Sequence, residues 1–99
     1  MEISIKNNDL KSIKEIISKF FNSKDYKLVI FGSRARRTAR KFSDYDIGVI
    51  GRRAVPLWKM ALVEEELEDS DLPYRVEVVD FALVSDDFKK VALKNFKKL

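Results

Sequence analysis

The sequence contains neither cysteine nor histidine among its 99 residues, and these two absences exclude several kinds of chemistry. Without cysteine the chain can form no disulfide and no thiolate nucleophile, which fits a reducing cytoplasm. Without histidine it also lacks the usual ligands of zinc sites and the base of Ser-His or Cys-His catalysis. A metal ion bound here would therefore be a hard cation held by carboxylates.

Glycine and proline are scarce, with three and two residues, so no low-complexity linker is expected to divide the chain. No apolar run approaches the length of a membrane span, and the segment MEISIKNNDLK lacks the apolar core of a signal peptide. Hydrophobic residues make up 45% of the chain, which is enough for globular folding. We therefore expect a single domain over residues 1–99.

The formal net charge is +4, from 20 basic and 16 acidic residues, and it is unevenly distributed. One segment is basic without any acid, at Arg34, Arg36, Arg37, Arg40 and Lys41. Another is acidic, at Glu64, Glu65, Glu66, Glu68, Asp69 and Asp71. The basic segment predicts a phosphate-bearing partner. The acidic segment is interpreted as a solvated helix face, with contact to a basic partner as the alternative.

The apolar periodicity predicts that helices and strands alternate along the chain. Helical stripes occupy residues 10–21, 56–67 and 86–99, the last after Ser85 as N-cap. Short apolar runs predict strands at residues 27–31, 44–51 and 74–84. This order indicates an α/β or α+β fold, a small mixed sheet with helices packed mainly on one face. The other face of the sheet would then be open for a site.

Two of the predicted helices have apolar faces that are expected to be buried. The first consists of Leu57, Met60, Ala61, Val63 and Leu67, and the second of Phe88, Val91, Ala92, Phe96 and Leu99. Trp58 is interpreted as a half-buried core or interface residue, with stacking on a nucleotide base as the alternative.

The segment GSRARRTARKFSDYDIGV, residues 32–49, joins a glycine turn to a run of arginines and two aspartates. Gly32 and Ser33 follow a strand and open a helical turn, where backbone N–H groups can bind phosphate. Asp44 and Asp46 are two positions apart on a strand, so both side chains leave one face of the sheet. Such a pair of like charges is best tolerated beside a cation such as Mg²⁺. The plain alternatives are a capped turn and a solvated strand end.

A third carboxylate comes from the segment RVEVVD in the next predicted strand. If the valines on either side of Glu77 face the core, Glu77 shares the open face with Asp44 and Asp46. Asp80 has the opposite parity and is the alternative. Several carboxylates on one face are what a two-metal site needs for in-line attack on phosphorus.

The combination of Gly-Ser, ten residues, Asp-x-Asp and a later acidic strand residue resembles the DNA polymerase β-like nucleotidyltransferase superfamily. With LPYRVEVVDF, it looks most like the minimal nucleotidyltransferases. The resemblance implies the nucleotidyltransferase fold and a Mg²⁺-dependent transfer of a nucleoside monophosphate, expected to be AMP from ATP, to a hydroxyl. It implies that Gly32 and Ser33 hold the triphosphate, that Asp44 and Asp46 hold the metals, and that Glu77 is the third metal-site carboxylate and helps to activate the hydroxyl.

Arg34 and Arg36, or at least one of them, are expected near the nucleotide phosphates or the acceptor, because guanidinium groups form strong charge-assisted hydrogen bonds with phosphate. The chain departs from the family pattern at Arg37, where close relatives often have glycine, and at Glu77, where the family usually has aspartate. Neither change removes a ligand, so an active enzyme is expected.

Minimal nucleotidyltransferases are commonly encoded beside a separate helical HEPN protein, and in many such pairs they act as antitoxins that add AMP to a tyrosine. The resemblance therefore implies an NTP and a HEPN-type protein as partners. An antitoxin that neutralises a helical partner by contact alone is a rival interpretation, and a basic nucleic-acid-binding protein is another. The basic run has no interleaved aromatic residues, which argues against nucleic acid. Self-association into an oligomer stays open.

Overall fold

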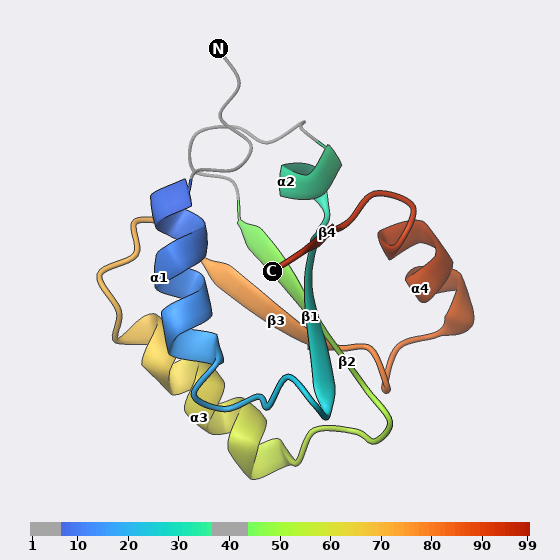
Figure 1. Cartoon of the computed structure of the whole chain (residues 1–99), viewed down its shortest axis with the longest axis horizontal. Helices are drawn as coiled ribbons and strands as arrows, with labels where there is room; N and C mark the ends of the chain where they lie inside the picture. Colours follow the sequence, from blue (N-terminus) through green and yellow to red (C-terminus); the bar gives the residue numbers. More distant parts are fainter. Residues whose placement is uncertain (1–6, 37–43) are drawn as a thin grey trace.

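The computed structural model describes residues 7–36 and 44–99, in which helices and strands alternate around one sheet (Figure 1). The elements are α1 (Asn7–Ile17), β1 (Tyr26–Phe31), α2 (Ser33–Arg36), β2 (Tyr45–Gly51), α3 (Leu57–Glu68), β3 (Val76–Asp80), α4 (Asp86–Ala92) and β4 (Lys97–Lys98). The sheet order is β3-β2-β1-β4, with β2 and β3 parallel and the other pairs antiparallel. The predicted mixed sheet is thus confirmed. No helix within the described ranges is long and apolar enough to cross a membrane.

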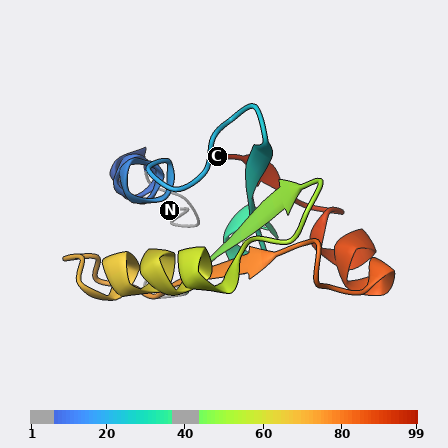
Figure 2. The ribbon, with the colours of Figure 1, turned by 90° about the horizontal axis from the view of Figure 1, so that it is seen from below.

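The main core lies between the sheet and the helices α1 and α3. Figure 2 shows these two helices on one side of the twisted sheet and α4 on the other. Tyr45, Ile47 and Val49 of β2 are fully buried in this core, together with Val63 of α3. Because side chains alternate along a strand, Asp46 leaves the opposite face. One face of the sheet therefore takes the two long helices, and the other presents a carboxylate.

A smaller apolar cluster forms on that opposite face and attaches α4 to it. Phe31 of β1 and Phe81 pack edge to face with their ring centroids 5.3 Å apart, and the Phe88 ring lies 6.0 Å from each. Gly48 of β2 leaves room for the cluster, since a Cβ there would lie 2.8 Å from the Phe81 ring. The cluster places α4 beside the face that carries Asp46.

The C-terminal part of the chain differs from the sequence prediction. The helix α4 ends at Ala92, and Lys97–Lys98 instead form a short strand at the free edge of β1. The expected apolar face is therefore not buried as a whole. Ala92 is buried, but Phe88, Val91 and Phe96 are 41%, 63% and 40% exposed. Backbone pairing at a sheet edge has prevailed here over the helical pattern of the side chains.

The other helix predictions had mixed outcomes. Ser85 caps α4 as expected, because its hydroxyl accepts a hydrogen bond from the backbone N–H of Phe88 at 3.1 Å. In α3 the apolar stripe is buried only at Val63 and Leu67. Trp58 is 65% exposed, so it is not a core residue, because the first turn of α3 extends past the strands (Figure 1). Its interpretation as an interface residue stays a prediction. Leu57 and Ala61 are exposed as well. The third strand is also shorter than predicted.

Candidate active site

The site begins at the turn that ends β1. Gly32 has a φ of +74°, in the left-handed region that glycine adopts without strain, and α2 starts at the next residue. A Cβ at Gly32 would collide with the Oδ2 atom of Asp46 on the neighbouring strand. Glycine is therefore required for two reasons, the backbone conformation and the close approach of the turn to a carboxylate.

The three carboxylates expected from the sequence line the same pocket as this turn. Asp44 directly precedes β2, Asp46 lies within it, and Glu77 lies on β3. Asp46 and Glu77 are register partners across the parallel strands, so their side chains leave the same face next to each other. Gly32 and Ser33 complete this side of the pocket. The structure thus brings together five residues from three separate segments of the sequence.

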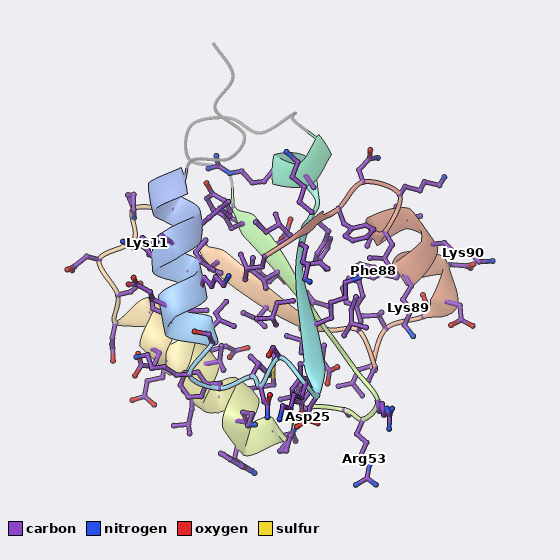
Figure 3. The ribbon with its side chains drawn as sticks, in the orientation of Figure 1. Lys11, Asp25, Arg53, Phe88, Lys89 and Lys90 are labelled. Carbon is purple, nitrogen blue, oxygen red and sulfur yellow. The ribbon has the colours of Figure 1, made fainter. Side chains whose placement is uncertain are left out.

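The rest of the pocket lining is apolar. It consists of Phe31 and Val79 from the sheet and Phe88, Val91 and Ala92 from α4. Figure 3 shows Phe88 on the side of α4 toward the sheet, whereas Lys90 extends away from the molecule. Sequence patterning assigned Phe88 and Val91 to the core, and only the position of α4 reveals that they line the pocket. A pocket with both a polar part and an apolar part suits a ligand with both phosphates and a ring.

The carboxylates are of the ligand type that Mg²⁺ prefers. Mg²⁺ is typically held by one or two protein carboxylates together with substrate phosphates and water. Asp44, Asp46 and Glu77 supply such oxygen atoms on one side of the pocket. Within residues 7–36 and 44–99, no group of three or more carboxylates is arranged as a complete metal site. An ion in this pocket would therefore take its remaining ligands from nucleotide and water.

Arg34 lies behind the site rather than in it. Its side chain is only 1% exposed, and its guanidinium carbon lies 4.2 Å from the centre of the Tyr45 ring and 5.9 Å from that of Tyr74. The Tyr45 hydroxyl donates a hydrogen bond to Oδ2 of Asp9 in α1 at 2.8 Å. Burial, and then the charge of Asp9, raises the pKa of the Tyr74 phenol well above its usual value. Arg34 therefore joins α2 to the core. It is not among the residues that line the pocket, where nucleotide phosphates were expected to meet it.

The remaining basic residues of the segment cannot be assigned to the pocket. Arg36 ends α2, but its side chain falls outside the described residues. Arg37, Arg40 and Lys41 also lie outside them. Their contact with phosphate stays a prediction.

Asp80, the alternative third carboxylate, stabilises two backbone segments. It is 6% exposed, and its two carboxylate oxygens accept hydrogen bonds from the backbone N–H groups of Val55, at 2.6 Å, and Ala82, at 2.9 Å. These bonds hold the loop before α3 and the turn after β3. Asp80 does not line the pocket, whereas Glu77 does. The geometry therefore favours Glu77 as the third carboxylate.

Comparisons of the sequence with known proteins find nucleotidyltransferases. The profile of the family described as "Polymerase beta, Nucleotidyltransferase" matches residues 11–99. A Haemophilus influenzae protein named "Probable protein adenylyltransferase MntA" is 32% identical over 93 residues, which are 94% of this chain and 80% of the relative.

Solved structures share the fold at lower sequence identity. A toxin–antitoxin structure with AMP-PNP has a TM-score of 0.72 at 22% identity and is matched over 89% of this chain and 69% of its own. A minimal nucleotidyltransferase structure has a TM-score of 0.67 at 23% identity, over 93% and 90%. A tri-AMPylated Shewanella oneidensis HEPN toxin in complex with an MNT antitoxin has a TM-score of 0.61 at 20% identity, over 89% and 69%.

Proposed function

The chain belongs to the polymerase β nucleotidyltransferase family, and we propose that it transfers AMP from ATP to a hydroxyl group. The observation that carries this proposal is the pocket in which the Gly32–Ser33 turn lies beside Asp44, Asp46 and Glu77. The adenylyl group is supported by the name of the Haemophilus influenzae relative and by the AMP-PNP present in a structure of the same fold. The unit proposed to act is one domain spanning residues 1–99.

Each part of the pocket has its own role in this reaction. The turn at Gly32 and Ser33 binds the triphosphate through backbone N–H groups and a hydroxyl. Asp44, Asp46 and Glu77 would hold Mg²⁺, which supplies charge neutralisation and alignment of the phosphates. The acceptor oxygen attacks the α-phosphorus, its proton passes to Glu77, and the α–β bond breaks to release pyrophosphate. The apolar wall from α4 keeps water from the reacting groups.

We place the acceptor on a separately encoded HEPN-type protein and expect it to be a tyrosine hydroxyl. The support is the relative's description as a protein adenylyltransferase and the AMPylated HEPN toxin found with an antitoxin of this fold. The chain would then act as an antitoxin that inactivates its partner covalently. We propose that this activity takes place in the cytoplasm, where ATP is available.

The test uses ATP labelled on the α-phosphate, the purified chain and the purified product of the neighbouring gene as the candidate HEPN-type partner. We expect label on the partner with Mg²⁺ and none with EDTA. The double variant Asp44→Asn/Asp46→Asn should transfer nothing. Asp25→Asn is the matched control, because Asp25 is an exposed carboxylate at the far end of the sheet (Figure 3). Transfer that persists in EDTA would disprove the metal-dependent reaction. Tight binding without any label would instead favour neutralisation by contact alone.

A further inference from the structure

A groove on the other side of the molecule takes no part in the proposed reaction. It lies where the end of α1 meets α3 (Figure 1), and it is lined by Ile16, Phe20, Leu62, Glu65, Glu66, Asp69 and Ser70. The helices α1 and α3 cover the core face of the sheet, whereas Asp46 and Glu77 leave the other face. The groove and the pocket are therefore on opposite sides, and a partner in the groove leaves the pocket accessible.

The floor of the groove is apolar and partly open to solvent. Ile16 and Phe20 are half-buried, and Leu62 is 43% exposed. Trp58 lies one helical turn before Leu62 on α3 and extends this apolar strip with a side chain that is 65% exposed. Tryptophan is the residue type most enriched among the anchors that protein partners bury. Its exposure beside a groove indicates a docking surface.

The rim of the groove is acidic. Glu65, Glu66 and Asp69 all contribute to it from α3 and the residue that follows. Lys19 forms an ion pair with Glu66 at 3.1 Å, whereas Glu65 and Asp69 form no ion pair with any residue that the structure describes. Glu65 and Asp69 are thus available to cations of a partner. This negative strip stands out on a chain whose net charge is +4.

We propose that this groove docks a basic amphipathic helix of a partner protein. The apolar face of that helix would pack on Trp58 and Leu62, and its lysine or arginine side chains would pair with Glu65 and Asp69. Charge complementarity selects this occupant, because an acidic helix would be repelled. A two-fold dimer of this chain is disfavoured for the same reason, since an isologous interface would bring the acidic rim against itself. The inference rests on residues outside the active site and does not depend on the proposed reaction.

Trp58 is the only tryptophan in the sequence, so its fluorescence reports directly on the groove. The probe is a tryptophan-free helical peptide with a leucine face flanked by lysine and arginine, and the matched probe carries glutamate at the same flanking positions. We expect a saturable blue shift with the basic peptide that weakens as salt is added. The acidic peptide should bind roughly tenfold more weakly, because each attractive rim contact becomes repulsive.

Variants separate the apolar and the charged contributions. Glu65→Lys/Asp69→Lys should reverse the preference between the two peptides, and Leu62→Asp should abolish binding of both. The control is Leu83→Asp, at a 68% exposed leucine in the connection between β3 and α4, which should leave the titration unchanged. Circular dichroism melts verify that each variant is folded.

Three results of the peptide titrations would overturn the proposal. They are the absence of a blue shift with the basic peptide, equal binding of the two peptides by the unmodified chain, and retained preference in the charge-reversed variant. A blue shift that grows with protein concentration alone, together with dimers in sedimentation, would assign the groove to self-association and would also overturn it.

Discussion

Asp46 and Glu77 are register partners on the parallel strands β2 and β3, and both line the pocket that begins at Gly32. Neighbouring strands lie about 4.8 Å apart, so two carboxylates that leave the same face at one register position are close neighbours. Their repulsion is relieved when a cation lies between them. This relationship connects the nucleotide turn, the proposed metal ligands and the proposed base.

The two carboxylates should differ in their effect when each is neutralised. Asp46→Asn should lose Mg·ATP binding together with activity, because it removes a ligand for the ion. Glu77→Gln should retain much of the ATP binding and lower the transfer rate by about 10²–10⁴-fold, the usual contribution of a general base. Calorimetry with Mg·AMP-PNP and single-turnover transfer measure the two quantities. A wild-type rate in Glu77→Gln would remove Glu77 from the chemical step.

Gly32→Ala should impair both folding and activity. A left-handed conformation costs a non-glycine residue about 1–2 kcal/mol, and the added methyl group would also meet the Asp46 carboxylate. We expect a lower melting temperature and no measurable transfer. Ser33→Ala is the matched variant at the neighbouring position, and it should weaken ATP binding because it removes the hydroxyl. A fully stable and active Gly32→Ala protein would contradict the described turn.

Arg34→Lys should destabilise the protein without a specific effect on nucleotide binding. The buried guanidinium lies over the Tyr45 ring, and a desolvated cation–π contact of this kind is worth about 2 kcal/mol. Lysine cannot reproduce the planar stacking. Chemical denaturation should show the loss of stability, and the ATP affinity of the folded fraction should be unchanged. A normal stability with weakened ATP binding would restore the role that the sequence suggested.

Asp80→Ala should lower stability while the folded protein keeps its activity. The substitution leaves the buried backbone N–H of Val55 without its acceptor, at a cost of about 1–3 kcal/mol, and also removes the acceptor of the more exposed N–H of Ala82. Thermal melts and transfer assays well below the melting temperature separate the two effects. Asp71→Ala is the control, at an exposed carboxylate in the loop after α3. A folded Asp80→Ala protein that is inactive would place Asp80 in the mechanism.

Tyr74→Phe should change how stability depends on pH in alkaline solution. Burial, and then the charge of Asp9, raises the pKa of Tyr74 in the folded protein above its unfolded value near 10. Above that pH the unfolded chain loses the phenolic proton while the folded chain retains it, so stability falls as pH rises. Urea denaturation near neutral pH and above about pH 10 should show this loss in wild type. The loss should be smaller in Tyr74→Phe.

The sheet and the arrangement of its carboxylates follow from local patterns in the sequence. Tyr45, Ile47 and Val49 are all buried, as their alternation predicts, because successive side chains of a strand leave opposite faces. The same rule placed Asp46 and Glu77 on the open face without knowledge of any contact. The turn at Gly32 was equally readable, since a glycine between an apolar strand and a polar helix marks a break in the backbone.

Only the tertiary structure decided which polar residues face the pocket and which support it. Arg34 turns toward Tyr45 and Tyr74, and Asp80 accepts a hydrogen bond from Val55, so each role depends on a residue far along the chain. The apolar periodicity of the sequence cannot reveal such contacts, because it describes one segment at a time. For the same reason the sequence did not predict the strand β4 or the pocket residues of α4. The strand β4 pairs with the free edge of β1, and α4 lies beside the open face of the sheet, and both of these surfaces exist only after the chain has folded.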